Sequence, residues 1–261
     1  MNIVFLCGSP NFTSSTDLGS MLLELEKRNI HVKAIIFIKL FSQKLFKLSW
    51  QKHGLKTFYK ALDLLARYRQ RRTGPDSRQR DSSDQSLTAL QVAQKFGIPV
   101  YYVSDFYQKR SLELLRKLEP DLFAPIGIGI VRKQILQIPR VGTLNAHSGL
   151  LPKYRGMNMV EWSLFDGHSL GVTIHFMDEG IDTGDILLQK EFDIDTGDTI
   201  DTLRDKSSRT GKQAMIETIE KINDGLLRPI PQKSGNGKQY FRMHQRLKLM
   251  IDKELKENYG G

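Results

Sequence analysis

Two residues with chemically useful side chains, Asn145 and His147, stand two positions apart at the end of the apolar run Val141–Ala146. Side chains alternate between the two faces of a strand, so a strand here would place both on one face. An amide can donate to a developing oxyanion without changing its charge, and an imidazole can carry a proton near neutral pH. The spacing indicates a site for acid–base chemistry, although a purely structural pair at a strand end has the same pattern.

A second group of ionisable side chains lies in the turn-rich stretch between two extended runs, Gly171–Met177 and Ile186–Phe192. This stretch holds Asp178, Glu179, Asp182 and Asp185. Turns often use Asp to cap backbone N–H groups, so we expect most of these acids to be structural. One carboxylate beside His147 would orient its ring and stabilise its cation. The residues alone do not say which of the four it is.

Two glycine-containing segments, one before the predicted helix Asp17–Arg28 and one before a helix expected after Gly156, could bind an anionic group, because the N-terminus of a helix attracts negative charge. The candidate residues are Gly8, Ser9 and Asn11 in the first segment, and Lys153, Arg155 and Gly156 in the second. An ordinary helix cap and solvated cations explain the same residues equally well.

The elements that must position these residues follow from the hydrophobic pattern, in which short apolar runs predict buried strands and three- and four-residue spacing predicts helices. The predicted strands are Asn2–Cys7, Val32–Ile38, Pro99–Val103, Asp121–Ile126 and Val141–Ala146, and the predicted helices are Asp17–Arg28, Leu87–Phe96, Phe106–Leu118, Thr199–Asn223 and Phe241–Leu255. This alternation predicts an α/β fold: a Rossmann-like, mostly parallel sheet with flanking helices and a C-terminal β-ribbon. Such sheets bind ligands beyond the carboxyl ends of their strands, where both groups of polar residues fall.

Bulk properties narrow the class of protein. No run approaches the roughly 18 apolar residues that span a bilayer, and Met1–Leu6 does not resemble a signal peptide. A single cysteine excludes an internal disulfide. We therefore expect a cytoplasmic protein. The net charge of +10 is confined to Lys39–Arg80, which holds 12 Lys and Arg residues and two acids. This segment predicts a basic amphipathic helix, followed by a mobile loop over Thr73–Ser86. Weak contact with an anionic surface through Lys39–Arg80 stays open.

Two separated motifs resemble a known family. The first is Asn145-Ala146-His147 followed by Gly149–Gly156 (GLLPKYRG), and the second is Gly171–Ile186 (GVTIHFMDEGIDTGDI). In this order and spacing they resemble the folate-dependent formyltransferases. That family includes glycinamide ribonucleotide formyltransferase, methionyl-tRNA formyltransferase and the N-formyltransferases of nucleotide-linked amino sugars. The likeness spans roughly Asn2–Arg228, and Ser148-Gly149 departs from the residues that usually follow the histidine.

The resemblance implies that Asn145, His147 and Asp182 are catalytic, that 10-formyltetrahydrofolate is the co-substrate and that no metal takes part. It places the folate along Ile126, Gly127, Ile128, Gly129, Asp178, Glu179, Gly180 and Ile181, and the acceptor amine beside Gly8, Ser9, Asn11, Lys153, Arg155 and Gly156. Residues 1–228 would form the catalytic domain, with 39–86 as a basic helical insertion and loop, and 229–261 would form a short helical tail.

The implied reaction is attack of an amine on the formyl carbon. Asn145 and a protonated His147 would stabilise the oxyanion of the tetrahedral intermediate, and Asp182 would hold His147. The tail is too short for an RNA-binding β-barrel, so we expect a small-molecule acceptor, a nucleotide-linked amino sugar, and no nucleic-acid partner. The alternatives are glycinamide ribonucleotide or methionyl-tRNA as acceptor, hydrolysis with water, and a basic membrane- or RNA-binding module on an inactive fold. The sequence does not predict the oligomeric state.

Overall fold

A seven-stranded sheet in the order β3-β2-β1-β4-β5-β7-β8 forms the centre of the computed structural model, which describes residues 1–8, 15–39, 87–233 and 237–259. Its strands are β1 (Ile3–Cys7), β2 (Val32–Ile38), β3 (Val100–Val103), β4 (Leu122–Ile126), β5 (Gly142–His147), β7 (Leu170–Phe176) and β8 (Ile186–Phe192). The strands from β3 to β5 pair in parallel, whereas β7 pairs antiparallel with both β5 and β8. The predicted α/β fold, with a mostly parallel sheet and a β-ribbon, is confirmed.

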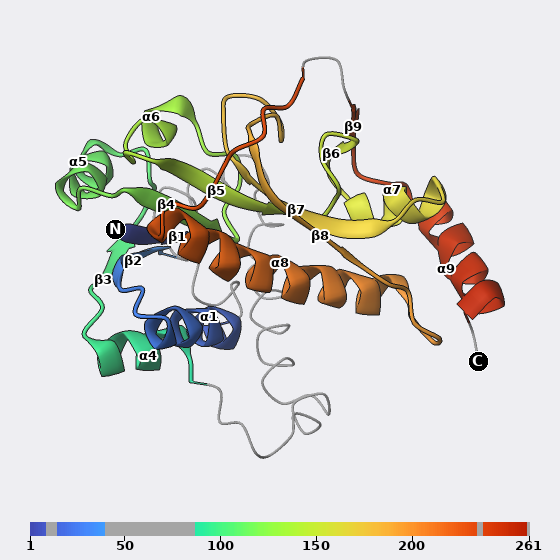
Figure 1. The fold of residues 1–261 in the computed structure, drawn as a ribbon, viewed down its shortest axis with the longest axis horizontal. Helices are drawn as coiled ribbons and strands as arrows, with labels where there is room; N and C mark the ends of the chain where they lie inside the picture. The colour runs from blue at the N-terminus through green and yellow to red at the C-terminus, as the bar shows by residue number, and fades with distance from the viewer. Residues whose placement is uncertain (9–14, 40–86, 234–236, 260–261) are drawn as a thin grey trace, which may run out of the picture.

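Helices cover both faces of this sheet (Figure 1). The helices on one face are α1 (Ser15–Lys27), α4 (Ala89–Phe96) and α8 (Ile200–Asn223), and those on the other are α5 (Lys109–Lys117) and α6 (Lys133–Leu136). Leu22 of α1, Val92 of α4 and Ile219 of α8 are fully buried in one core, and Leu115 of α5 belongs to the core of the opposite face. Apolar residues spaced for a helix on either side of buried strands therefore produce a three-layer arrangement.

The start of α8 matters for the site described below, and the sequence fixes it locally. Thr199 precedes the helix, and its hydroxyl accepts a hydrogen bond from the N–H of Thr202, while the Thr202 hydroxyl accepts one from the N–H of Thr199. This reciprocal cap satisfies N–H groups that have no partner within the helix, and such a cap contributes about 1 kcal/mol.

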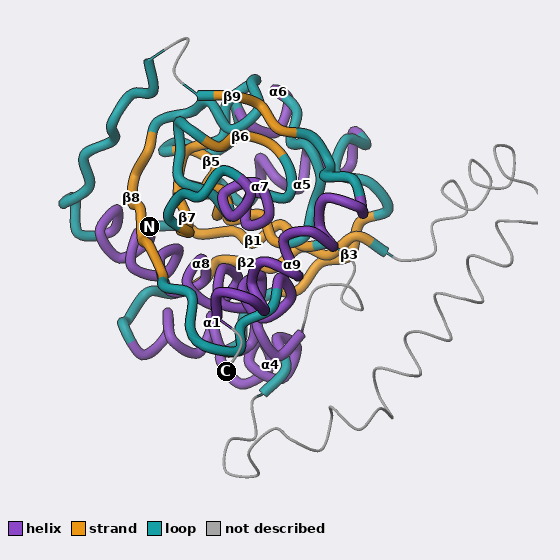
Figure 2. The backbone as a smooth tube through the Cα atoms, turned by 90° about the vertical axis from the view of Figure 1, so that its right-hand side faces the viewer, coloured by secondary structure: helices purple, strands orange, loops and turns teal. Residues whose placement is uncertain are grey.

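The C-terminal helix α9 (Gln245–Tyr259) lies at the end of the molecule away from α5, where it packs near α7 (Met159–Phe165) (Figures 1 and 2). Before α9, the short strand β9 (Lys238–Tyr240) pairs in parallel with β6 (Tyr154–Gly156). The final helix thus begins at Gln245 rather than at the predicted Phe241. A third small core holds these parts together, and its buried members are Val160, Leu170, Ile200, Leu203, Met243, Ile251 and Leu255.

The basic helix and loop predicted for residues 39–86 lie, apart from Lys39, outside the described residues. Within the described part of the chain, no helix is long and apolar enough to cross a membrane.

Candidate active site

Pairing between β5 and β7 brings polar side chains together on one face of the sheet. Asn145 lies opposite His175, and His147 lies opposite Thr173. The amide Nδ2 of Asn145 is 3.1 Å from Nε2 of His175. Asn145 and His147 share this face as predicted, and His175, which no sequence pattern singled out, joins them. It is buried, yet it belongs to the polar cluster.

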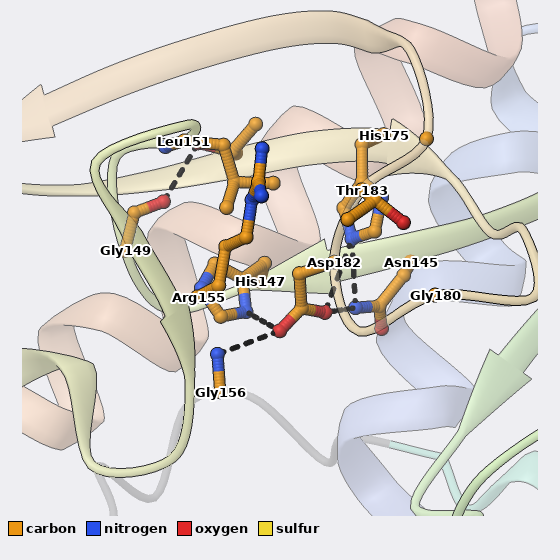
Figure 3. A network of polar contacts seen from close by, with 12 residues as sticks. Asn145, His147, Gly149, Leu151, Arg155, Gly156, His175, Gly180, Asp182 and Thr183 are labelled. Carbon is orange, nitrogen blue, oxygen red and sulfur yellow. Dashed lines mark hydrogen bonds and ion pairs between the residues drawn. The ribbon is translucent and has the colours of Figure 1, made fainter. Parts of the chain in front are cut away.

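Asp182 completes this cluster from the loop between β7 and β8 (Figure 3). Its Oδ2 accepts a hydrogen bond of 2.8 Å from the N–H of Gly156 and lies 3.5 Å from Nδ1 of His147. Its Oδ1 lies 3.5 Å from both Nε2 of His175 and Nδ2 of Asn145. The carboxylate therefore touches every other polar side chain of the cluster, which the sequence motif alone could not show.

Each histidine uses one ring nitrogen to bond a backbone carbonyl. His147 Nε2 lies 2.7 Å from the carbonyl oxygen of Tyr154, and His175 Nδ1 lies 2.8 Å from that of Phe176. Because a carbonyl oxygen only accepts, these nitrogens carry the proton in the neutral rings. The lone pairs then reside on His147 Nδ1 and His175 Nε2, which face Asp182 and Asn145.

Burial and charge set the protonation of the pair His147 and Asp182. Burial lowers the pKa of His147 below its ordinary value of 6.5, although the charge of Asp182 and the Tyr154 carbonyl raise it. Burial raises the pKa of Asp182, but the nearby rings of His175 and His147 and the hydrogen bond from the Gly156 N–H outweigh burial and leave this pKa below its ordinary value of 3.8. At neutral pH the cluster therefore holds a neutral imidazole beside an ionised carboxylate, which can stabilise the imidazolium once a proton arrives.

The cluster lines a cavity of about 860 Å³ beyond the carboxyl ends of β4 and β5. All the residues predicted to bind the folate line it: Ile126, Gly127, Ile128, Gly129, Asp178, Glu179, Gly180 and Ile181. Asp178 accepts hydrogen bonds from the N–H of Gly180 and the hydroxyl of Thr183, so it shapes the loop. Glu179 forms a 2.7 Å ion pair with Lys133 of α6, and both side chains are exposed.

The predicted acceptor residues divide into several groups. Gly156 lines the cavity and holds Asp182, whereas Lys153 and Arg155 are not among the lining residues. Gly8 is buried, and its N–H donates to the carbonyl of Ile126. Ser9 and Asn11 lie outside the described residues.

Helix α8 forms a wall of the cavity that we did not predict. The lining residues of this wall are Arg204, Ser207, Ser208, Gly211, Lys212 and Met215. The Ser207 hydroxyl is buried and has no hydrogen-bond partner among the described residues. Lys212 forms a 2.8 Å ion pair with Asp17 of α1. The sequence of α8 does place polar residues at three- and four-residue steps, but this spacing is the same for a helix that lines a cavity and for one whose polar face is in solvent.

The tail contributes Gln239, Tyr240 and Phe241 to the same cavity. No sequence pattern indicated this, because the pairing that brings β9 to β6 spans 84 residues of chain, from Tyr154 to Lys238. Among the described residues, no group of three or more His, Cys, Asp or Glu side chains could hold a metal ion.

The structure thus combines an α/β fold with a buried His–Asp pair in the wall of a cavity. Residues 60–219 match the family model described as formyl transferase, and the chain belongs to this family. The resemblance to folate-dependent formyltransferases is thereby confirmed.

A methionyl-tRNA formyltransferase of Thermodesulfovibrio yellowstonii is 39% identical over 163 residues, which are 61% of this chain and 53% of that protein. The chain thus spans about half the length of the curated relatives it matches. Because this relative is named for a tRNA, it gives no support to the expectation that nucleic acid is an unlikely partner.

Among solved structures, glycinamide ribonucleotide transformylase 1 from Symbiobacterium toebii has a TM-score of 0.58 at 19% identity and covers 88% of this chain and 94% of its own. A sugar N-formyltransferase from a Shewanella species has a TM-score of 0.58 at 15% identity and covers 97% and 86%. At such identities the two structures agree on the fold alone.

Proposed function

We propose that this chain transfers the formyl group of 10-formyltetrahydrofolate to the amine of a small molecule, with a nucleotide-linked amino sugar as the acceptor. The observation that carries the proposal is the position of His147 Nδ1, which lies 3.5 Å from the carboxylate of Asp182 in the wall of the cavity, while Nε2 of the same ring is held by the Tyr154 carbonyl. Membership of the formyl transferase family supports formyl transfer as the class of reaction.

The side chains of the cluster can perform the proton transfers that amine attack requires. As the amine adds to the formyl carbon, its proton moves to Nδ1 of neutral His147, and Asp182 stabilises the resulting imidazolium. Asn145 has two amide hydrogens: one meets His175 Nε2, and the other lies too far from Asp182 to be held firmly, at 3.5 Å. This second N–H is available to the oxyanion. As the intermediate collapses, the bond between the formyl carbon and the folate nitrogen breaks, the imidazolium of His147 gives its proton to that nitrogen, and tetrahydrofolate leaves.

The cavity suits the proposed co-substrate in size and in lining. Its volume of about 860 Å³ falls within the roughly 300–1,000 Å³ of cavities that bind small organic molecules. Apolar side chains on its edge, Ile130 and Ile181, are 77% and 38% exposed and can pack against flat rings. The folate would supply the formyl group; the turn after β4 and the loop before β8 would hold it.

The wall that α8 forms has side chains that can bind a phosphate-bearing acceptor. Arg204 and Lys212 provide cations even though each also pairs with an acid, Arg204 with Glu161 and Lys212 with Asp17, and the Ser207 hydroxyl, which has no partner among the described residues, provides a donor. Phe241 lines the cavity although it is 71% exposed, which supports stacking against a nucleobase. A nucleotide joined to an amino sugar offers both a phosphate and a base.

Methionyl-tRNA is a second candidate acceptor, supported by the name of the relative that is 39% identical. The aminoacyl end of a tRNA also presents an amine, phosphates and a base, so the described residues suit both acceptors.

The test is an assay of purified protein with 10-formyltetrahydrofolate and, separately, nucleotide-linked amino sugars, glycinamide ribonucleotide, charged initiator tRNA or no amine. We expect tetrahydrofolate release and a formylated product with an amino sugar, lost in His147→Ala and retained in the exposed control His31→Ala. Turnover with charged tRNA alone would establish the second candidate, and release without an amine would indicate a hydrolase. No turnover with any acceptor would contradict the proposal.

A further inference from the structure

Gln232, in the segment that follows α8, contacts the loop that carries Asp182. Its amide Nε2 donates to the carbonyl oxygen of Asp182 at 3.1 Å and to that of Gly184 at 2.6 Å. Its Oε1 accepts a 3.1 Å hydrogen bond from Nη2 of Arg155. Gln232 lies beyond residues 60–219, so the family match does not include it.

The loop needs such an external support because its backbone is strained at the functional residue. Asp182 has a φ of 53°, in the left-handed region that residues with a Cβ adopt at a cost. Gly184 passes so close to Phe176 that a Cβ would lie 2.0 Å from the Phe176 carbonyl oxygen. Hydrogen bonds to the carbonyls of Asp182 and Gly184 hold the turn from both sides of Thr183.

We infer that Gln232 is a positioning residue that holds Asp182 against His147, and that Arg155 sets the orientation of the Gln232 amide. With Arg155 at Oε1, both N–H groups of the amide face the two loop carbonyls. Arg155 does not line the cavity, so this role replaces the predicted one as an acceptor ligand. The inference rests on the proposed function, in which His147 and Asp182 act as a pair.

The backbone fixes Gln232 on both sides, so its side chain is preorganised. Two residues earlier, Ile230 exchanges backbone hydrogen bonds of 2.8 and 2.9 Å with Ile186 of β8. A few residues later, β9 pairs with β6, the strand that contains Arg155. Described residues before and after Gln232 are thus paired with the ribbon and with β6, and its amide needs little ordering to bind the loop.

The first test compares Gln232→Leu with the control Lys233→Ala, which changes the exposed neighbouring residue. We expect Gln232→Leu to lower kcat about 10- to 100-fold, as small displacements of catalytic groups do, with little change in the KM for either substrate. In the Asp182→Asn background the same substitution should cost less than about twofold, because a residue that acts through Asp182 has nothing left to position. Equal losses in both backgrounds, or a change in KM alone, would overturn the inference.

Arg155→Met provides a second variant in case Gln232→Leu unfolds the protein. If Arg155 orients the amide of Gln232, Arg155→Met should lower kcat, as Gln232→Leu does. If it binds the acceptor instead, only the KM for the acceptor rises, which contradicts the inference.

A measurement without turnover separates this inference from the proposed function. The charge of Asp182 raises the pKa of His147, so displacement of the carboxylate lowers it further. NMR titration of His147 should show this fall in Gln232→Leu and none in Lys233→Ala, even if no acceptor is ever found. An unchanged His147 pKa in Gln232→Leu would overturn the positioning role alone.

Discussion

At the scale of single residues, His147 is subject to two opposed influences. Burial lowers its pKa, and the charge of Asp182 raises it again by a smaller amount. A base whose pKa lies below 6.5 stays neutral over the physiological range, while its partner carboxylate, with a pKa below 3.8, stays charged. The pair can therefore accept a proton without first losing one.

This balance predicts the pH dependence of turnover. Activity requires neutral His147, so it should be present above the lowered pKa of His147 and fall as the pH drops through it. Asp182→Asn removes the charge that raises this pKa, so the acid limb of kcat/KM should move to lower pH, while kcat itself falls about 10²- to 10⁴-fold. The control is Asp205→Asn, which changes an exposed acid on α8. An acid limb that stays in place or moves to higher pH in Asp182→Asn would contradict the role given to the pair.

The residues of the cluster differ in how well the sequence predicted them. The period of a strand was sufficient to place Asn145 and His147 on one face. His175 escaped prediction because its position opposite Asn145 depends on the register between β5 and β7, which is a property of the folded ribbon. Physical reasoning left Asp182 among four loop acids, and only the resemblance to a family singled it out. Its loop conformation and its contacts, from Gly156 to Gln232, arise from distant parts of the chain.

At the scale of elements, a buried carboxylate joins three helices. Glu161 of α7 is 1% exposed and forms ion pairs with Arg204 of α8 and, at 2.9 Å, with Lys248 of α9. Burial raises its pKa, but the hydrogen bonds from Arg204 and Lys248 outweigh this and leave the pKa below 4.5. Because Arg204 also lines the cavity, these ion pairs connect the packing of the helices to the site.

We therefore expect Glu161→Gln to lower the free energy of unfolding by about 1–3 kcal/mol at pH 7, since it weakens two charged hydrogen bonds. A lowered pKa means that the contribution is present above the unfolded value and disappears as the pH falls through the folded value. Urea unfolding should show the two proteins converging below about pH 4, the ordinary range of a carboxyl pKa. Glu113→Gln, at an exposed pair with Lys109, should change stability by less than about 0.5 kcal/mol. A deficit that persists unchanged at low pH would contradict this account.

Pairing between β6 and β9 depends on Gly156. Its φ is 105°, and a Cβ would lie 2.1 Å from the carbonyl oxygen of Tyr240. Gly156→Ala should therefore displace β9, weaken the N–H contact to Asp182 and reduce both stability and kcat. The matched control is Gly225→Ala, where φ is 70° but nothing lies within 4 Å, so only the backbone cost of roughly 1–2 kcal/mol applies. Equal losses of stability and unchanged kcat in the two variants would show that the contact with Tyr240 is unimportant.

The sequence predicted a helix or strand better when its hydrophobic pattern extended over more residues. The buried strands and the longer helices produced apolar runs or a helical period, and each lies within a few residues of its predicted bounds. Strands β6 and β9 have three residues each, too few for a period, and their partners are remote in sequence. The missed strands are therefore those whose formation depends on tertiary contact.

At the scale of the whole molecule, residues 229–233 and 237–259, the described part of the predicted helical tail, pack against the rest of the described fold. Met243, Ile251 and Leu255 are buried against Leu203 and other residues of the third core. The same segment contributes Gln232 to the loop of Asp182 and Phe241 to the cavity. The division into a catalytic domain and a tail at residue 228 stays a prediction from the sequence. The packing of the described residues indicates that the two parts unfold as one cooperative unit.

Two identical substitutions on α9 test this cooperativity. Leu255 is 4% exposed and Leu249 is 59% exposed, so both lose the same atoms when changed to alanine, but only one leaves a cavity. Leu255→Ala should lower the free energy of unfolding by about 2–4 kcal/mol, and Leu249→Ala by less than about 0.5 kcal/mol. If α9 and the sheet unfold together, hydrogen exchange in Leu255→Ala should accelerate in the most protected amides of β1 and β4 as well as in α9. Acceleration confined to α9, with β1 and β4 unchanged, would instead show that the C-terminal helix unfolds on its own.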